Sequence, residues 1–460
     1  MLTYDLDRRG KLARYDYLYR CIREDILAGR LTAGEKLPSK RSLASHLQTA
    51  VITVQNAYAQ LEAEGYLYTR EKRGDYVADV ERHPAAPGRA PARSAPQPQR
   101  SWLLDLSSGG SGTEDFPFSV WAKLMRRVLS EEGEALLRAT PPNGADALRR
   151  AIAQHLYRFR GISAAPEQIV VGAGTEYLYN LIVQLLGREA VYGVEDPGYS
   201  KAARIYALGG ARTAPVLVDE GGVSLRSLEM SDAQILHTSP NHQFPTGAVT
   251  PIGRRQSLLR WAEAREGRYI IEDDYDSEFR FTLRPIPTLQ SIDRAGRVIY
   301  VNTFSRTLAP SLRISYMVLP KSLTERYRAQ LGFYSSTVPA MEQYTLARFL
   351  DEEYFEAHIN RMRKSYRAQR DAVIDTILQS PLGEHCRVSG EDAGLHFLLT
   401  IDTKCTDHVL RADAEGRGVR LSFLSDFALR PGSAPQHTLV IHYPGIDLGR
   451  LRSALSILEA

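Results

Sequence analysis

The sequence predicts a multidomain protein with an N-terminal winged helix-turn-helix and a larger α/β domain, whose mostly parallel sheet is followed by a smaller α+β part. Three observations predict this. The first 80 residues carry three helical patterns and then two short alternating segments. Residues 81–101 are rich in proline and alanine, and beyond them short apolar strands alternate with helices. A length of 460 residues suits two or three domains.

The region 1–80 is predicted to form the winged helix. Apolar residues recur at helical spacing from Tyr15 to Ile26, which indicates a first helix. Ser39 is suited to cap a short second helix. The third helix buries one side, made of Val54, Ala57, Tyr58 and Leu61. The segments GYLYTR and DYVADV then alternate like two strands around the turn EKRG, which predicts the wing.

The region 81–101 is predicted to be an extended linker. It contains five prolines, five alanines and four arginines, and few residues that can pack. Residues 1–101 hold 17 basic and 12 acidic side chains, so this end carries a net charge of +5 and the remainder −1. The excess of positive charge weakly favours a polyanionic partner for the N-terminal module.

The third helix is predicted to enter the major groove of DNA, because its residues outside the core are polar and uncharged. Base contacts are expected from Thr53, Gln55 and Asn56. Contacts with phosphates or the minor groove are expected from two places. These are the start of the second helix, with Lys40 and Arg41, and the wing turn, with Lys72, Arg73 and Gly74. The alternative is a winged helix that contacts another protein.

The region 102–460 is predicted to hold the α/β domain, with a large part at about 140–321 and a small part at about 322–460. Five apolar segments are predicted strands, at 168–171, 190–194, 234–238, 269–271 and 298–301. LHFLLT and TLVIHY are strand-like segments of the small part. Each of the five strands runs into a polar loop, and ligands of open α/β sheets bind beyond the carboxyl ends of the strands. The loops are therefore the expected binding site.

Three of these loops suit a phosphorylated, ring-containing ligand. The turn GAGT enters a helix whose first N–H groups could hold a phosphate, although such turns are more often only tight connections. Asp273 and Tyr275 in EDDYDSE suit a ring nitrogen and a ring oxygen, with a solvated acidic loop or a metal site as the alternatives. TFSRTLAPSLR supplies donors for an anion, unless it is a basic surface loop.

The sequence predicts a cytoplasmic protein with no membrane segment and no metal site. No apolar run approaches the ~20 residues that cross a bilayer, and the first residues are charged where a signal peptide is apolar. The three cysteines, Cys21, Cys386 and Cys405, are far apart, which argues against a disulfide framework or a zinc site.

With these motifs in view, the chain resembles the MocR/GabR family of bacterial regulators, in which a GntR-type winged helix is tethered to an aminotransferase-like domain of fold type I. The resemblance rests on LPSKRSLASHL, TVQNAYAQLEAEGYL, EDPGY, SPNHQFPTG, IEDDYDSEF, TFSRTLAPSLR and HINRMRKSYRAQRD, which together span nearly the whole chain. It implies a homodimer, with heads and bodies exchanged head to tail, that binds a double-stranded DNA operator. It also implies that the protein binds pyridoxal 5′-phosphate and responds to a small amine or amino acid.

The resemblance also assigns roles to single residues. Tyr199 would stack on the pyridine ring, Asp273 would pair with its nitrogen, and Tyr275 would face the phenolic oxygen. His242 and Gln243 lie where a further contact with the ring oxygen is expected. The phosphate would be surrounded by Ala173, Gly174, Thr175, Thr303, Ser305 and Arg313.

The chain departs from the family at Arg306, where the family motif has the lysine that forms the internal aldimine. A guanidinium stays protonated and has no free amine lone pair, so covalent attachment of the cofactor at 306 is excluded. An engineered substitution that traps a noncovalent or external-aldimine state, a natural lineage with noncovalent cofactor and a lineage with another ligand all remain open. Lys201 is the nearest other amine.

Two further departures concern the ligands. Val440 falls near the place of an arginine that holds the carboxylate in the γ-aminobutyrate sensor of the family, so that effector is not favoured. Val51 stands where many GntR-type heads have arginine, so the operator is expected to differ. The resulting hypothesis is a DNA-binding regulator with a non-catalytic body and no catalytic residues. The alternatives are an aminotransferase with an accessory DNA-binding head, against which Arg306 argues, and a protein-interaction module.

Overall fold

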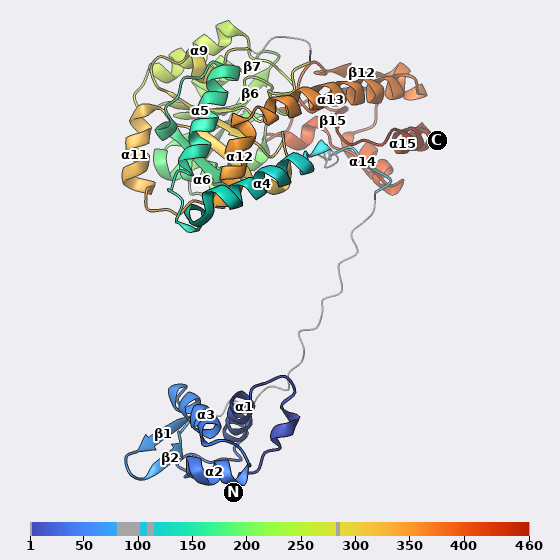
Figure 1. Ribbon diagram of the computed structural model, residues 1–460. Coiled ribbons are helices and arrows are strands. Elements are labelled where there is room, and N and C mark those ends of the chain that lie inside the picture. Colours follow the sequence, from blue (N-terminus) through green and yellow to red (C-terminus); the bar gives the residue numbers. More distant parts are fainter. Residues whose placement is uncertain (1, 81–101, 108–114, 282–285, 460) are drawn as a thin grey trace. The chain divides into compact units, whose positions relative to one another are not determined.

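The computed structural model describes residues 2–80, 102–107, 115–281 and 286–459. The chain divides into two compact units, Met1–Gln99 and Arg100–Ala460, which we call the head and the body (Figure 1). The linker expected at 81–101 lies outside the described residues. In the part of the chain that is described, no helix combines the length and the apolar character that a membrane crossing requires.

The head is a winged helix-turn-helix. Its elements are η1 (Leu6–Arg9), α1 (Arg14–Leu27), α2 (Lys40–His46), α3 (Val51–Ala63), β1 (Leu67–Arg70) and β2 (Gly74–Val77). The Ser39 hydroxyl accepts a hydrogen bond from the Ser42 N–H at 3.2 Å, which confirms the expected cap of α2. The side chains of Val54, Ala57 and Leu61 on α3 are fully buried. The three predicted helices and the wing are therefore confirmed.

The body is built on one eight-stranded sheet in the order β4-β11-β10-β9-β8-β5-β6-β7. The strands are β4 (Ile169–Ala173), β5 (Val191–Asp196), β6 (Arg212–Asp219), β7 (Gly222–Val223), β8 (Ile235–Thr238), β9 (Tyr269–Asp273), β10 (Val298–Thr303) and β11 (Ile314–Val318). Neighbours from β10 through β9, β8 and β5 to β6 pair in parallel, whereas β11 and β7 are antiparallel to their neighbours. The five strands predicted from apolar segments are confirmed.

Helices cover both faces of this sheet. Alternate residues of its central strands point to opposite sides, so each face presents apolar side chains on which helices pack. On β10, Ile299 and Val301 belong to the core beneath α6 (Thr175–Leu186), α7 (Ser200–Leu208) and α11 (Lys321–Leu331). Val298 and Tyr300 point to the opposite face. The helices on that side include α4 (Phe118–Glu132), α5 (Asp146–Arg160), α8 (Leu225–Met230), α9 (Ile252–Glu263), α10 (Leu289–Ile292) and α12 (Ala340–Asp351).

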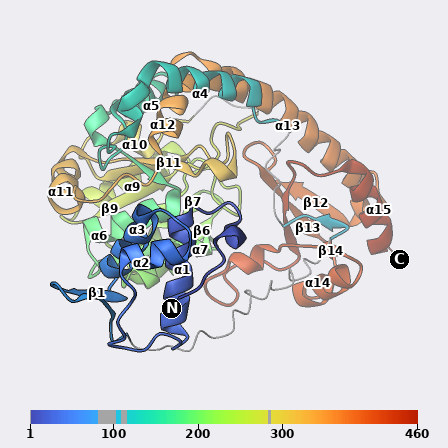
Figure 2. The same cartoon turned by 60° about the horizontal axis from the view of Figure 1, so that its bottom comes forward.

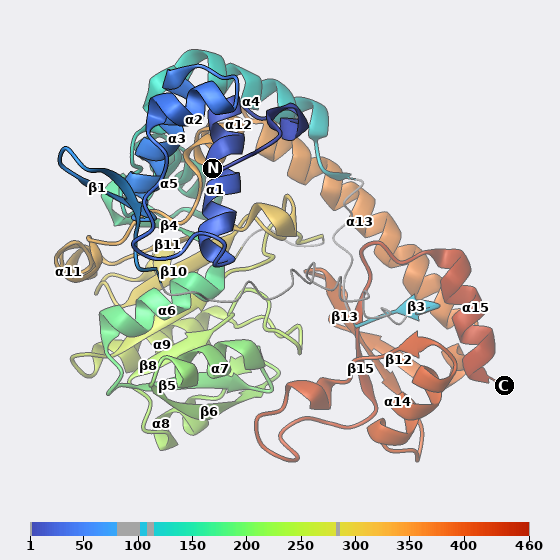
Figure 3. The same cartoon turned by 90° about the horizontal axis from the view of Figure 1, so that it is seen from below.

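The small part of the body contains a three-stranded antiparallel sheet. Its elements are β12 (Cys386–Ser389), β13 (His396–Ile401), β15 (Thr438–His442), α14 (Asp407–Gly416) and α15 (Leu448–Glu459). The long helix α13 (Tyr354–Leu378) runs from the helices of the large sheet to this small sheet (Figures 2 and 3). A separate pair joins β3 (Leu104–Asp105) to β14 (Val419–Arg420) in parallel, so the first described residues of the body pack on its C-terminal part. Short 3₁₀ turns complete the body: η3 (Gly133–Leu137), η4 (Pro166–Gln168), η5 (Pro310–Leu312), η6 (Pro381–His385) and η7 (Leu424–Phe427).

The helices α11 and α12 follow residue 322, near which the sequence analysis expects the small part to begin. The helix α11 packs on α6, and α12 packs on α4 and α5, so both still cover the large sheet. An amphipathic pattern predicts a helix, but it does not say which sheet the helix covers. The change from one part to the other occurs along α13.

Candidate functional site

A cavity of about 330 Å³ lies at the carboxyl ends of the parallel strands, where the sequence predicts a ligand site. It receives residues from the loops after β4, β5, β8, β9 and β10. Its lining consists of Gly174, Thr175, Glu176, Tyr179, Tyr199, Lys201, Ser239, Phe244, Asp273, Tyr275, Thr303, Ser305, Arg306, Pro310 and Arg313. Nine of the twelve residues expected to contact a cofactor are therefore brought together.

Part of the cavity lining is suited to an anion. The helix α6 begins there, and its unpaired N–H groups favour negative charge. Gly174 precedes the helix with φ of +93°, and a Cβ at this position would clash with the Arg313 guanidinium. This glycine is therefore required for the close approach of Arg313. The buried hydroxyl of Ser305 has no hydrogen-bond partner among the described residues, so it can donate to an anion.

The cavity lining also includes the Asp273 carboxylate, which is only 6% exposed. Its Oδ2 accepts a hydrogen bond from the Tyr179 hydroxyl at 2.5 Å, and His237 Nε2 lies 3.4 Å from the same oxygen. Burial, and then the charge of Asp273, raise the pKa of Tyr179, so the phenol stays a donor. Oδ1 of Asp273 has no partner among the described residues. A buried carboxylate oxygen without a partner is suited to a protonated ring nitrogen.

Aromatic residues also line the cavity. The rings of Tyr199 and Phe244 meet edge to face, with centroids 6.4 Å apart, and Phe244 meets Tyr275 in the same way at 6.4 Å. Tyr199 remains 38% exposed, so its ring offers a free surface to a ligand. Burial raises the pKa of Tyr275 well above its usual value, which keeps its phenol protonated. An aromatic ligand could therefore pack between aromatic surfaces.

The two long cations Arg306 and Lys201 differ in what they contact. Arg306 is exposed, and its guanidinium makes no hydrogen bond or ion pair with any described residue. Lys201 donates to Glu176 at 2.7 Å, and this contact raises the pKa of Lys201. Glu176 also pairs with Arg313 at 3.3 Å. Lys201 is therefore held as an ammonium, without the lone pair that a carbonyl requires, whereas Arg306 is available to an anionic ligand.

Three of the predicted cofactor residues do not line the cavity. The N–H of Ala173 donates to the Thr337 hydroxyl at 3.0 Å. His242 is buried against Asp276, and its Nδ1 lies 3.1 Å from the Tyr275 hydroxyl. The side chain of Gln243 donates to Glu195 at 3.1 Å and to the carbonyl of Pro197 at 3.0 Å. Gln243 therefore holds the loop that carries Tyr199, and His242 lies behind Tyr275.

Several lining residues were not predicted from the sequence. These are Glu176, Tyr179, Ser239, Phe244 and Pro310. Three of them lie in quoted motifs, Ser239 and Phe244 in SPNHQFPTG and Pro310 in TFSRTLAPSLR, so a closer reading of those loops could have found them. Tyr179 gave no signal, because it lies one turn into an apolar helix and its hydroxyl finds Asp273 only in the folded sheet.

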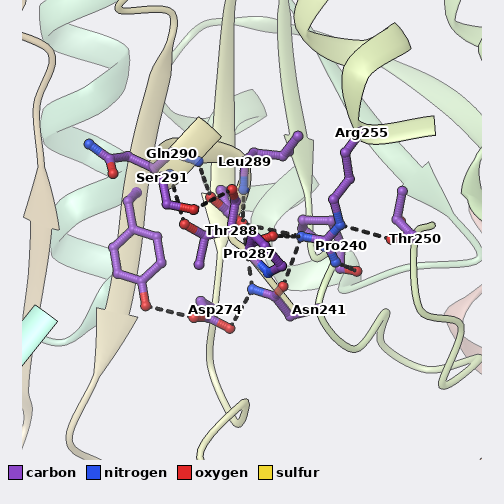
Figure 4. A network of polar contacts seen from close by, with 12 residues as sticks. Pro240, Asn241, Thr250, Arg255, Asp274, Pro287, Thr288, Leu289, Gln290 and Ser291 are labelled. Atoms are coloured by element: carbon purple, nitrogen blue, oxygen red, sulfur yellow. Dashed lines mark hydrogen bonds and ion pairs between the residues drawn. The ribbon is translucent and has the colours of Figure 1, made fainter. Parts of the chain in front are cut away.

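A buried network fixes the loop after β8 against the end of β9 (Figure 4). The Arg255 side chain is 0% exposed and donates to the carbonyls of Pro240 at 2.7 Å and Thr250 at 2.8 Å, and to the Asn241 side chain at 2.9 Å. Asn241 in turn donates to Asp274 at 2.8 Å. Because Asp274 adjoins Asp273, this network holds the segment that carries the Asp273 carboxylate of the cavity lining.

The head places the predicted DNA contacts on three neighbouring segments. Arg41, Gln55, Asn56, Lys72 and Arg73 are exposed, and Thr53 is partly exposed. Lys40 is partly exposed and pairs with Asp75 of β2 at 3.4 Å, which joins the start of α2 to the wing. Gly74 has a φ of +104°, as the wing turn requires. Val51 and Ile52, at the start of α3, are 43% and 58% exposed.

Comparison with known proteins identifies both units. Residues 14–77 match the family described as bacterial regulatory proteins, gntR family, and residues 103–410 match aminotransferase class I and II. The probable rhizopine catabolism regulatory protein MocR of Rhizobium meliloti is 34% identical over an alignment of 474 positions, which covers 99% of this chain and 95% of that protein. The chain belongs to the MocR/GabR family. Its head is a GntR-type domain, its body has the fold of type I aminotransferases, and the family members are transcriptional regulators.

Two more similarities bear on this MocR/GabR regulator. The pyridoxine biosynthesis transcriptional regulator PdxR of Corynebacterium glutamicum is 33% identical over 439 residues, covering 95% of this chain and 93% of that protein. Among solved structures, LysN, an α-aminoadipate aminotransferase of Thermus thermophilus complexed with N-(5′-phosphopyridoxyl)-L-leucine, has a TM-score of 0.67 and 26% identity. The match covers 77% of this chain and 90% of that chain. The aminotransferase fold family to which the body belongs binds pyridoxal 5′-phosphate.

Proposed function

We propose that this regulator binds an operator in double-stranded DNA through its head, in the cytoplasm, and that its body binds pyridoxal 5′-phosphate without a covalent bond. The body then senses the cofactor, alone or together with a small amine or amino acid, and performs no transamination. The observation that carries this proposal is the free Oδ1 of Asp273 in a cavity whose lining also includes residues suited to an anion.

The residues present fit the cofactor. Asp273 would pair with the ring nitrogen, and Tyr199 would pack against the ring. The phosphate would lie at the start of α6, with donors from Thr175, Ser305 and Arg313. When bound, the cofactor supplies an aldehyde that reacts reversibly with amines. The chain supplies the orientation of the ring and the charge that retains the phosphate.

Arg306 accounts for a noncovalent site. It stands where the family resemblance places the lysine, and it lines the cavity with no ionic partner among the described residues. A delocalised, always protonated guanidinium binds carboxylate and phosphate oxygens but forms no bond with an aldehyde. Arg306 would therefore hold an anionic group of the cofactor or of the effector.

The effector is proposed to be a small amine or amino acid other than γ-aminobutyrate. Val440, expected near the carboxylate-binding place of the family, is fully buried among Leu398, Leu424 and Ala434 and does not reach the cavity. Ligand binding would shift the body between two arrangements and so alter the spacing of two heads in a head-to-tail homodimer. Such a shift requires that the ligand bind one arrangement more tightly than the other.

Binding of the full chain to its own promoter tests the DNA half of this proposal. We expect a specific complex in a mobility-shift assay, and we expect Gln55→Ala to weaken it by about 1–3 kcal/mol, because this exposed side chain would contact a base edge. Lys72→Ala should weaken specific and unrelated DNA alike and lower the salt slope by about one. Ile52 would add an apolar contact with a thymine methyl group.

The matched control is Glu62→Ala, at the exposed far end of the same helix. It should leave specific binding unchanged. If the full chain forms no specific complex at moderate salt, the DNA half of the proposal is wrong. Transamination by the purified protein with several amino donors would instead favour the aminotransferase with an accessory head.

A further inference from the structure

A second cavity of the body, of about 440 Å³, is formed by the long helix α13 and the loop after β9. Its lining consists of Arg280, Phe281, Asn360, Arg363, Lys364, Arg367, Ala368 and Asp371. We call this cavity the basic cleft, because four of its eight lining residues are cations. It shares no lining residue with the cavity that contains Asp273, so it is a separate feature of the body.

The cations of the basic cleft are not neutralised by its own lining. Lys364 and Arg367 are exposed, and neither makes a hydrogen bond or an ion pair with any described residue. The acid of the lining, Asp371, accepts from Nε and from a terminal nitrogen of Arg370 at 2.9 Å and 2.6 Å. Arg370 lies outside the lining, so the charge of Asp371 is already offset by a cation that does not face the cleft.

The other two cations of the basic cleft are recessed. Arg280 and Arg363 are only partly exposed, and burial lowers the pKa of both guanidinium groups. The charge of Asp392 acts in favour of the Arg280 cation, whereas that of Arg160 acts against it. Arg363 is fixed to the loop after β9, because its Nε donates to the carbonyl oxygen of Glu278 at 2.5 Å. The buried Nε of Arg280 has no hydrogen-bond partner among the described residues.

A solvated basic surface explains only part of this arrangement. The segment HINRMRKSYRAQR of α13, residues 358–370, contains five arginine or lysine residues and no acid. Like charges one turn apart, such as Arg363 and Arg367, destabilise a helix, whereas solvated helices are usually stabilised by pairs of opposite charge. Exposure to water accounts for Lys364 and Arg367. It does not account for two more cations recessed beside them, because partly buried charges and unpaired donors are costly unless an anion meets them.

We propose that the basic cleft binds a small molecule that carries a diphosphate or triphosphate group. A guanidinium group can pair with two phosphate oxygens at once, and an ammonium group adds a compact charge. The volume of the cleft is that of an ordinary small-molecule site. Because Arg280 and Arg363 are recessed, a narrow chain of phosphates suits the cleft better than the broad backbone of a double helix.

Calorimetric titration of the full chain with inorganic tripolyphosphate, in the absence of DNA and of pyridoxal 5′-phosphate, tests this proposal. We expect one site per chain, with an affinity roughly 10-fold or more above that for inorganic phosphate, because more charge-assisted contacts form. The affinity should fall as the salt concentration rises. Lys364→Gln and Arg367→Gln should each weaken binding by about 5- to 30-fold. Both side chains are exposed, so the fold should persist in these variants.

Three control variants show where the tripolyphosphate binds. Lys123→Gln, which removes an exposed lysine of α4, is the matched control and should bind tripolyphosphate as the unchanged chain does. Lys72→Ala removes a cation of the wing, and Arg313→Gln removes one from the cavity that contains Asp273. Neither should change the affinity. Loss of binding in Arg313→Gln, with full binding in Lys364→Gln, would place the anion in the other cavity and overturn the proposal.

Hydrogen–deuterium exchange of the unchanged chain gives a second readout that requires no variant. Tripolyphosphate should slow exchange in segment 360–371, and slowing confined to other segments would overturn the proposal. Failure of the unchanged chain to bind tripolyphosphate would overturn it as well. If Lys364→Gln and Arg367→Gln then lowered the affinity for DNA, the cleft would be a DNA contact instead. Tripolyphosphate is tested without DNA or cofactor, so this inference and the proposed function fail separately.

Discussion

Replacing Arg306 by lysine is expected to change dialysable binding of pyridoxal 5′-phosphate into covalent attachment that borohydride makes permanent. The physical reason is the availability of a lone pair. An amine with a pKa that a cavity can lower reacts with an aldehyde, whereas a guanidinium remains protonated and delocalised. Because Arg306 borders the same cavity as Asp273 and Ser305, a lysine at this position would be near the bound aldehyde.

An absorption-monitored titration of both chains with the cofactor, followed by borohydride treatment and mass measurement of the intact protein, checks this prediction. The unchanged chain should bind saturably and lose the cofactor on dialysis. Arg306→Lys should gain the mass of one reduced adduct. Arg326→Lys, an exposed substitution of the same kind on α11, should behave like the unchanged chain. If neither chain binds the cofactor, the cavity has another ligand and the sensing half of the proposal must be rebuilt.

Asp273→Asn is expected to weaken binding of pyridoxal 5′-phosphate by about 2–3 kcal/mol, roughly 30- to 150-fold. The substitution retains an oxygen that can accept from Tyr179, so local packing should persist. It replaces a negative charge by an amide at the position that would pair with a protonated ring nitrogen. The dissociation constant of the cofactor, measured by the same titration, checks the prediction.

The control for Asp273→Asn is Asp219→Asn, which removes an exposed carboxylate that pairs with Arg254 outside the cavity. This variant should bind the cofactor as the unchanged chain does. Equal affinity of Asp273→Asn and the unchanged chain would show that the ring nitrogen does not contact Asp273, and the orientation proposed for the ligand would be wrong.

The strands that position the cavity were predictable from the sequence, and others were not. Those ending at Ala173, Asp273 and Thr303 are short apolar segments that run into polar loops. By contrast, β11 begins at Ile314, directly after a polar loop, with no turn signal between them. The strand β6 contains a proline, and its residues are mostly exposed or half-buried, so it lacks the continuous buried apolar pattern of the central strands. The predicted β4 lies at the edge of the sheet, whereas β11 and β6 are internal, so prediction depended on clear boundaries in the sequence and not on the place of the strand in the sheet.

The candidate site was predictable where position along a strand fixes the direction of a side chain. Asp273 ends β9 and Thr303 ends β10, so both follow from the strand assignment. The directions of His242 and Gln243 do not follow, because both lie in an irregular loop whose shape depends on buried contacts with Asp276 and Glu195. Such contacts join residues more than thirty positions apart, and a single sequence does not reveal them.

The affinity of the full chain for its promoter, measured with and without saturating pyridoxal 5′-phosphate, tests the central claim most directly. If the body senses the cofactor, the two affinities should differ by a coupling of about 1–3 kcal/mol, roughly 5- to 150-fold. Asp273→Asn should retain DNA binding and lose this difference at cofactor concentrations that saturate only the unchanged chain. Specific DNA binding with the same affinity in the presence and absence of the cofactor would contradict the claim.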